Sequence, residues 1–282
     1  MRYYIMYNPL AGGGRGMDEV RMLDVIYEGE VIFQDLTQLH DLRSFLAGLE
    51  PADVVVLCGG DGTLNRFAND TRDLELHHEI RYYANGTGND FLRDLAMAQG
   101  DEPMPINQYL KALPTVTVKG HDLHFINGVG FGIDGYCCQE GDRLRQQSGK
   151  PVNYTTIAIK GLLFHYQPTK ATVTVDGQRF TYENVWIAAT MKGRYYGGGM
   201  MNAPAQDRLD PEGKVSLVLF HGAGRLKTLL VFPSIFKGTH INHPKQVATH
   251  TGRDITVRFD RPTPLQIDGE TVLDVEEYRV HT

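Results

Sequence analysis

The sequence predicts an α/β protein with two domains: an N-terminal doubly wound parallel sheet and a C-terminal antiparallel β-sandwich-like domain with a few helices. Three observations support this fold class. Over residues 1–98, apolar strand-like runs alternate with helix-like segments, as in parallel sheets that are covered on both faces. A polar, proline-bearing stretch at 99–105 marks a junction. Beyond it, short strand-like segments follow one another closely and include the hairpin signal Asp176-Gly177.

In the N-terminal part, each predicted strand is an apolar run bounded by polar or Gly-rich residues. Residues 53–58 (Asp-Val-Val-Val-Leu-Cys) show this most clearly, because they lack the apolar–polar alternation of a half-exposed strand. The segments between the runs have helical character. The predicted strands are 2–7, 30–34, 53–58 and 80–84, and the predicted helices are 17–26, 39–49, 65–74 and 90–98.

In the C-terminal part, the predicted strands are connected by tighter turns, and helix-like segments occur near 152–166 and 225–236. The motif Gly130-Phe-Gly-Ile-Asp-Gly135 matches the G-x-G-x-x-G pattern of dinucleotide-binding loops. It lacks the βαβ context that such loops require, so we interpret it as a turn with close backbone packing. The predicted strands are 115–119, 121–126, 172–175, 178–182, 184–190, 215–220, 254–259 and 265–267.

Composition and charge exclude several classes of protein. The chain has 282 residues with 41% hydrophobic and 22% charged residues, which is normal for a globular protein. No apolar run is long enough to span a membrane, and the N-terminus lacks the layout of a signal peptide. The net charge of −6 argues against nucleic acid as the main partner. Three cysteines without a C-x-x-C pair argue against a zinc site, and we expect a cytoplasmic protein.

Three glycine-rich loops follow predicted strands and precede predicted helices. They occupy residues 8–16 (Asn-Pro-Leu-Ala-Gly-Gly-Gly-Arg-Gly), 59–65 (Gly-Gly-Asp-Gly-Thr-Leu-Asn) and 86–90 (Gly-Thr-Gly-Asn-Asp). Glycines at such turns permit positive φ and a close approach of the backbone to a ligand. The N–H groups of the turn and of the helix start can bind phosphate, and ligands of doubly wound sheets lie at the carboxyl ends of strands. The three loops together indicate a bound nucleotide.

Single residues of these loops have other interpretations. Gly, Asn and Asp are common in ordinary tight turns, and Asn65, Asn89 and Asp90 can act as helix caps. Asp61 is harder to explain as a cap, because a carboxylate repels a triphosphate unless Mg²⁺ or a water network lies between them. The sequence contains neither a Walker A loop nor a G-x-S-x-G elbow, which excludes P-loop enzymes and serine hydrolases of that type.

The loops and several later motifs resemble the diacylglycerol kinase catalytic-domain family, which includes bacterial soluble lipid kinases and sphingosine kinases and is more distantly related to NAD kinases. The later motifs are Phe125–Asp134 (Phe-Ile-Asn-Gly-Val-Gly-Phe-Gly-Ile-Asp), Gly197-Gly-Gly-Met200 and Gln266-Ile-Asp-Gly-Glu270. The resemblance covers nearly the whole chain. It implies a nucleotide-binding domain over 1–120 and a lipid-substrate domain over 121–275, with 276–282 returning to the first domain.

The resemblance also implies an activity, namely transfer of the γ-phosphate of ATP to a hydroxyl of diacylglycerol or a related lipid, with Mg²⁺ as cofactor. Asp61 is expected to order the metal and its water network. The proton acceptor is expected in the turn at Asp268-Gly-Glu270, where Glu270 is the first choice and Asp268 the rival. The residues expected to bind the nucleotide are Asn8, Gly59, Gly60, Asp61, Gly62, Thr63, Leu64, Asn65, Gly86, Thr87, Asn89 and Asp90.

Similar kinases hold a second, structural Mg²⁺, which maps onto Leu209 and Lys214 through carbonyl oxygens and Glu212 through its carboxylate, with Asp210 as an alternative acid. The lipid substrate implies transient, peripheral contact with a membrane surface. The sequence leaves open whether the chain forms a homodimer. Two basic clusters are candidates for the membrane contact, although each alone is typical of a solvated helix face. They comprise Arg143, Arg145, Lys150 and Lys160, and Lys227, Lys237, His240, His243 and Lys245.

Two other functions fit part of the sequence. NAD kinases share the Gly-Gly-Asp-Gly loop, but their second motif normally contains an Asn-Glu pair instead of Gly-Thr-Gly-Asn-Asp. A non-catalytic nucleotide or lipid sensor would not need the intact Asp61 or the Asp-Gly-Glu turn at 268–270. Both interpretations therefore rank below the lipid kinase.

Overall fold

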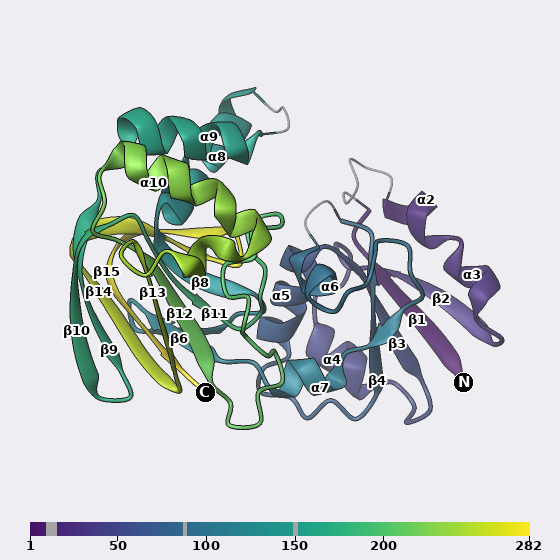
Figure 1. Cartoon of the computed structure of the whole chain (residues 1–282). Coiled ribbons are helices and arrows are strands. Elements are labelled where there is room, and N and C mark those ends of the chain that lie inside the picture. The colour runs from purple at the N-terminus through teal and green to yellow at the C-terminus, as the bar shows by residue number, and fades with distance from the viewer. Residues whose placement is uncertain (10–15, 87–88, 149–151) are drawn as a thin grey trace. The chain divides into compact units, whose positions relative to one another are not determined.

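The computed structural model describes residues 1–9, 16–86, 89–148 and 152–282. They form two compact units, Met1–Leu113 and Pro114–Thr282, which appear in purple to teal and in teal to yellow in Figure 1. The first unit is built on a mostly parallel sheet and the second on an antiparallel sheet with a few helices. The predicted fold class is therefore confirmed. The division between the units falls before residue 120, because the strand at 115–118 pairs within the second sheet.

The sheet of the first unit has the order β2-β1-β3-β4-β5, in which the first four strands are parallel and β5 is antiparallel. Residues 54–58 are 0–4% exposed, as expected for a central strand covered on both faces. Its strands are β1 (Arg2–Tyr7), β2 (Glu30–Asp35), β3 (Val54–Gly59), β4 (Glu79–Ala84) and β5 (Met104–Pro105). Its helices are α2 (Gly16–Val20), α3 (Leu23–Ile26), α4 (Leu42–Ala47), α5 (Asp61–Asp70), α6 (Asp90–Asp94) and α7 (Asn107–Lys111).

The second unit contains a ten-stranded antiparallel sheet. Its strands are β6 (Thr115–Val118), β7 (His121–His124), β8 (Gly128–Gly132), β9 (Thr169–Val175), β10 (Gln178–Val185), β11 (Ile187–Met191), β12 (Val215–Phe220), β13 (Val247–Gly252), β14 (Asp254–Ile267) and β15 (Glu270–His281). Its helical segments are α8 (Ile133–Ser148), α9 (Tyr154–Lys160), the π-helix η1 (Gly161–His165), α10 (Arg225–Val231) and the 3₁₀ segments η2 (Phe232–Lys237) and η3 (Thr239–Asn242).

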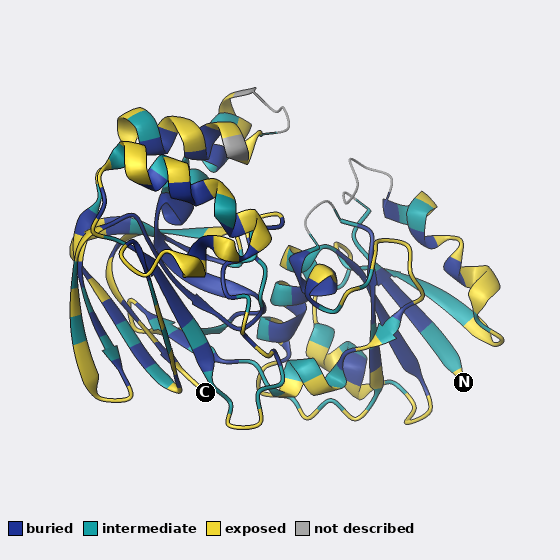
Figure 2. Cartoon of the chain, in the orientation of Figure 1, coloured by how far each residue is buried: buried dark blue, intermediate teal, exposed yellow. Residues whose placement is uncertain are grey.

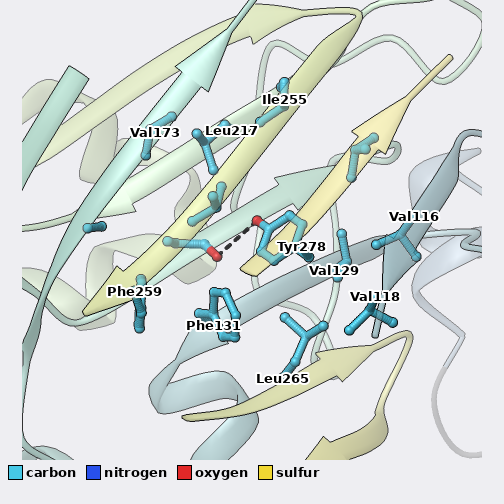
Figure 3. Packing of buried hydrophobic residues seen from close by; sticks show 14 of the residues in the cluster. Val116, Val118, Val129, Phe131, Val173, Leu217, Ile255, Phe259, Leu265 and Tyr278 are labelled. Atoms are coloured by element: carbon cyan, nitrogen blue, oxygen red, sulfur yellow. Dashed lines mark hydrogen bonds between the residues drawn. The ribbon is translucent and has the colours of Figure 1, made fainter. Parts of the chain in front are cut away.

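Apolar side chains on both sides of this sheet are buried in two separate clusters. In one cluster Phe131 stacks on Phe259 with ring centroids 4.6 Å apart and lies beside Tyr278 (Figure 3). The other cluster packs helical residues such as Leu162 against strand residues such as Ile187. Figure 1 shows α8, α9 and α10 together on this side. The helices thus form one layer over the sheet, with their inner faces buried.

Several elements differ from the sequence prediction, among them β13, which was not predicted, and the predicted helix at 17–26, which is divided into α2 and α3. The helix α8 was not predicted, because its mostly polar sequence includes Gly141 and only one side is covered by the protein. The segments at 254–259 and 265–267 form one bent strand, β14. The last residues lie in β15, which pairs with β14 and with β6, so 276–282 belong to the second unit and do not return to the first.

The glycines of the G-x-G-x-x-G motif are required by packing in the second unit. A Cβ atom on Gly132 would lie 2.2 Å from the carbonyl oxygen of Trp186, and one on Gly135 would lie 1.9 Å from that of Pro264. The expected close backbone packing is therefore confirmed, whereas the expected turn is wrong, because the motif lies in the end of β8 and the first turn of α8. Among the helices of the described residues, none is long and apolar enough to cross a membrane.

Candidate functional site

Three neighbouring parallel strands of the first unit end at the same edge of the sheet. Tyr7 at the end of β1 pairs with Cys58 of β3, and Gly59 at the end of β3 pairs with Ala84 of β4. The three glycine-rich loops therefore begin side by side, as the sequence predicted. Residues 10–15 of the first loop, together with Thr87 and Gly88, lie outside the described residues.

Gly59 and Gly86, in the second and third loops, serve close packing rather than positive φ. Gly60 has a φ of −99° and is the N-cap of α5. A Cβ atom on Gly86 would lie 2.5 Å from the Cα atom of Gly60, and one on Gly59 would lie 2.4 Å from the side chain of Thr63. The expectation of positive φ is thus wrong for these positions, and the close contacts are with other parts of the protein, so the approach of this backbone to a ligand stays a prediction. Gly62 differs, because a Cβ atom there would meet nothing within 4 Å.

The helix α5 begins at Asp61, so part of the second loop forms its first turn. The backbone N–H groups of Thr63 and Leu64 donate to the carbonyl oxygen of Gly60, at 3.0 and 3.2 Å. The Leu64 side chain is fully buried in the unit. Asn65 lies inside the helix and accepts from the amide of Asn69, so it is not an N-cap. Gly60, the N-cap residue, is extended and supplies no side-chain capping bond of its own.

Asp61 connects the second loop to the third. Its carboxylate accepts hydrogen bonds from the backbone N–H groups of Asp90, at 2.8 Å, and Phe91, at 3.3 Å. These two N–H groups begin α6, so Asp61 caps a helix from another part of the chain. Asn89 occupies the N-cap position itself, but its side chain makes no capping bond and instead donates to the carbonyl oxygen of Gly86 at 2.7 Å. The expectation that Asp61 is not a cap is therefore wrong.

Two amide side chains at this edge carry buried polar atoms without a partner. Within the part of the chain that the structure describes, neither polar atom of Asn85 has a hydrogen bond, and the Oδ1 atom of Asn89 has none. A buried polar group without a partner costs about 1–3 kcal/mol. Donors and acceptors of a ligand would remove this cost, so the edge fits a polar ligand. Sequence analysis missed Asn85, although its position directly after β4 places it level with Gly60.

The Asp-Gly-Glu turn of the second unit connects β14 to β15. Asp268 and Gly269 both have positive φ, 47° and 93°, as in a tight hairpin turn. The Asp268 carboxylate accepts hydrogen bonds from the backbone N–H groups of residues 126–128, at 2.5, 2.8 and 2.9 Å. Its own N–H donates to the carbonyl oxygen of Gly128 at 3.0 Å. Asp268 therefore ties the turn to the segment that leads into β8.

Arg208 binds the same backbone segment that Asp268 binds. It is 5% exposed, and its guanidinium donates to the carbonyl oxygen of Ile126 and, at 2.8 Å, to the Oδ1 atom of Asn127. The same two residues donate their N–H groups to Asp268. Arg208 thus holds the backbone that holds Asp268. Nothing in the sequence around Arg208 distinguishes it from a surface arginine, so sequence analysis missed it.

Glu270 differs from Asp268 in its surroundings. Its side chain is exposed, and no hydrogen bond or ion pair to a described residue engages its carboxylate. The pKa of Cys138 on α8 is raised to about 12, mainly by burial and to a smaller extent by nearby carboxylates that include Glu270. Glu270 therefore lies near α8 and remains accessible, whereas Asp268 is fully engaged by the backbone.

In the loop predicted to hold a second metal ion, the predicted ligand groups of Glu212 and Lys214 contact other groups of the protein. The Glu212 carboxylate pairs with the ammonium group of Lys214, and the carbonyl oxygen of Lys214 accepts from the amide of Gln206 at 3.0 Å. Asp210 accepts from the N–H groups of Glu212 and Lys214, at 2.9 and 3.0 Å. A lysine ammonium thus occupies the position of a cation beside Glu212. The metal site at Leu209, Glu212 and Lys214 stays a prediction.

Comparison with known proteins agrees with this architecture. The model of the diacylglycerol kinase catalytic domain matches residues 2–118, and the model of the YegS C-terminal NAD kinase beta sandwich-like domain matches residues 127–278. The chain belongs to the diacylglycerol kinase catalytic-domain family. The two matches follow each other along the chain and correspond to the parallel and antiparallel units.

Relatives of this family extend over most of the chain. A diacylglycerol kinase of Mycobacterium tuberculosis (strain ATCC 25618 / H37Rv) is 24% identical, with 83% of this chain and 78% of that protein covered. A diacylglycerol kinase of Bacillus subtilis (strain 168) is 26% identical, with 79% and 73% covered. A solved diacylglycerol kinase structure from Bacillus anthracis str. Sterne gives a TM-score of 0.62 at 16% identity, over 99% of this chain and 92% of that chain. The structural similarity shows the shared fold.

Proposed function

We propose that this member of the family is an ATP- and Mg²⁺-dependent lipid kinase that phosphorylates a hydroxyl of diacylglycerol or a related lipid. The edge of the first unit carries the proposal. There, loops on neighbouring parallel strands meet, Asp61 links two of them, and the buried amide of Asn85 and the Oδ1 atom of Asn89 lack partners among the described residues. Because ATP is the phosphoryl donor of the cytoplasm, the proposed reaction places the protein there.

In this proposal the nucleotide completes the edge of the first unit. Its phosphates lie against the first turn of α5 at Gly62, where the open space leaves room for them. The side chains of Asn85 and Asn89 gain the partners they lack. Asn8 follows β1 at the same edge and belongs to the same binding surface.

The carboxylate of Asp61 is a suitable ligand for the proposed Mg²⁺ ion. Mg²⁺ beside a nucleotide is held mainly by phosphate oxygens and water, together with one or two carboxylates. Among the described residues, no group of three or more His, Cys, Asp or Glu side chains is arranged to hold a metal ion, so a metal bound largely by protein is not supported. Bound Mg²⁺ would neutralise charge on the transferred phosphoryl group.

Proton transfer is assigned to Glu270. As the lipid hydroxyl oxygen bonds to the γ-phosphorus, the bond from that phosphorus to the bridging oxygen breaks, ADP leaves, and the carboxylate of Glu270 takes the hydroxyl proton. Asp268 is unsuited to this task, because three backbone N–H groups already occupy its carboxylate. We assign Asp268 to positioning the turn.

The test is incubation of the protein with labelled ATP and Mg²⁺, together with diacylglycerol in mixed micelles, other lipids with a free hydroxyl, or NAD. We expect a labelled phospholipid and no NADP. NADP formation without a lipid product would identify an NAD kinase. Binding of ATP without phosphorylation of any acceptor would indicate a sensor.

A further inference from the structure

The helical layer of the second unit exposes large apolar side chains to solvent. We define the helical layer here as α9, η1, α10 and η2, without the neighbouring α8, in which Glu140 and Asp142 pair with Arg143 and Arg145. Phe164 is 69% exposed, Leu226 is 74% exposed and Leu230 is 82% exposed. Leu226 and Leu230 are four residues apart and therefore lie on one face of α10. Figure 2 shows the exposed parts of α9 and α10 on the outside of the layer.

These side chains are not needed to cover the sheet. The opposite faces of the same helices supply the buried residues, among them Leu162 of η1 and Val231 of α10. The segments are also joined to each other, because the guanidinium of Arg225 donates to the carbonyl oxygen of Leu162 at 2.9 Å. Exposed residues of η1 and α10 thus belong to one continuous layer, in which Ile159 and Phe236 are 41% and 45% exposed.

The charge of this layer is opposite to that of the whole chain. The protein has 34 acidic residues and a net charge of −6, yet residues 152–175 and 213–253 contain no Asp or Glu. The exposed cations Lys160, Lys227 and Lys237 lie within these stretches. His240, counted with this basic cluster in the sequence, is buried with its ring stacked on Phe220 and does not contribute to the surface.

We propose that the helical layer is the surface through which the protein binds an anionic lipid bilayer. Exposed apolar side chains beside lysines are the features of segments that lie in the headgroup region, where the apolar groups enter the acyl boundary and the lysines attract anionic headgroups. The inference rests on the proposed lipid kinase activity for its biological sense, because diacylglycerol resides in the bilayer. A second copy of the chain is a poorer occupant, since two such basic faces repel each other.

Binding to vesicles tests the proposal without any catalysis. We measure sedimentation of the protein with phosphatidylglycerol vesicles and with phosphatidylcholine vesicles, in the absence of ATP. We expect binding to phosphatidylglycerol that weakens with salt. The double variant Leu226→Glu/Leu230→Glu should bind at least roughly tenfold less, because burying each leucine in the boundary is favourable and glutamate is repelled. The control Val25→Glu replaces an apolar residue of α3 that is 89% exposed and should bind as the original protein does.

The lysines give an independent test. Each lysine near an anionic surface strengthens binding by roughly fivefold, so Lys227→Ser/Lys237→Ser should weaken vesicle binding by about 25-fold. The matched control Lys111→Ser changes an exposed lysine of α7 and should have no effect. All these positions are exposed, and unchanged thermal unfolding would confirm that the variants fold.

Several outcomes would distinguish the proposed surface from its alternatives. Vesicle binding by the leucine variant equal to that of the original protein would exclude this surface. If the original protein forms a dimer in sedimentation velocity and the leucine variant does not, while vesicle binding is unchanged, the helical layer would be the contact with a second copy of the chain. Phosphorylation of dissolved short-chain diacylglycerol without binding to anionic vesicles would refute the docking surface and leave the lipid kinase standing. Vesicle binding that depends on Leu226 and Leu230, without any lipid phosphorylation, would refute the kinase and support the surface.

Discussion

The edge of the first unit and the Asp-Gly-Glu turn of the second are built in opposite ways. At the edge, the buried amide of Asn85 and the Oδ1 atom of Asn89 have no partner among the described residues, and the space beside Gly62 is open. At the turn, the Asp268 carboxylate accepts three backbone N–H groups, and Arg208 holds the same backbone from the other side. One site is incomplete without a ligand, and the other is complete in itself.

This difference indicates which role each of the two regions has in the proposed reaction. A surface with unpartnered polar groups gains free energy when a ligand satisfies them, so the edge is suited to binding. A network in which each group is satisfied holds its geometry, so the turn is suited to placing one accessible carboxylate, Glu270. Variants that remove a single group should therefore have different consequences in the two regions.

The largest effect is expected at Glu270. Replacement by Gln keeps the size of the side chain but removes the oxygen that accepts the proton, so kcat should fall by on the order of 10²-fold or more. The KM for ATP and the melting temperature should remain unchanged, because the side chain is exposed and no described residue pairs with it. Steady-state kinetics and thermal unfolding measure both.

Asp268→Asn is the comparison variant for Glu270→Gln. An amide would turn an N–H donor toward the backbone N–H groups of residues 126–128, so this variant should lose thermal stability as well as activity. If Glu270→Gln keeps near-normal turnover while Asp268→Asn abolishes it without loss of stability, the two roles are exchanged. If both keep turnover, the proton acceptor lies elsewhere, and Asp61 becomes the next candidate.

A smaller effect is expected for Gly62→Val, which tests the incomplete edge. The open space at Gly62 accommodates the new side chain in the free protein, but the phosphates would then meet it. ATP affinity should fall by roughly tenfold or more, about 1.4 kcal/mol, in calorimetric titration. The control is Gly224→Val, another open glycine with negative φ (−76°), in the second unit. Unchanged affinity in folded Gly62→Val would remove this turn from the binding surface.

Arg208→Met tests the complete turn. Loss of the guanidinium should let the backbone around Ile126 relax, so that Glu270 is placed less accurately and kcat falls by about tenfold with the KM for ATP unchanged. Arg208→Lys should restore activity only in part, since an ammonium group cannot reproduce the two-pronged contact. The control Arg258→Met changes an arginine whose side chain is 61% exposed. A rise in KM for ATP instead of a fall in kcat would contradict a positioning role.

An effect on stability instead of activity is expected at Asp134, whose buried carboxyl accepts a hydrogen bond from the hydroxyl of Tyr196 at 2.7 Å. Burial raises its pKa from 3.8 to about 7. Between these values the folded protein retains a proton that the unfolded chain loses, so this group destabilises the fold increasingly from about pH 4 to pH 7. Asp134→Asn should therefore raise the free energy of unfolding at pH 8 by about 1–3 kcal/mol, and by less at pH 5. Equal changes at both pH values in thermal unfolding would contradict the raised pKa.

Local sequence patterns were sufficient to predict the parallel sheet of the first unit. The run at 54–58 is apolar without alternation, and such a strand has to be covered on both faces. The glycine-rich loops could be placed at the carboxyl ends of β1, β3 and β4 for the same reason, because the alternation of strands and helices implies a parallel sheet. The hairpin at Asp176-Gly177 was likewise evident, since positive φ at both positions favours this residue pair.

The sequence alone thus determined the four parallel strands of the first unit, the hairpin turn at Asp176-Gly177 and the residue types at the candidate site, all of which depend on neighbours within a few positions. Only the tertiary structure decided what each side chain contacts. Asp61 caps a helix 29 residues away, and Asp268 accepts N–H groups about 140 residues away. The helix α8 and the contacts of Arg208 could not be predicted, because they also depend on segments far apart in the sequence. The free energy of these contacts comes from burial and from hydrogen bonds between distant segments, which no local pattern of residues encodes.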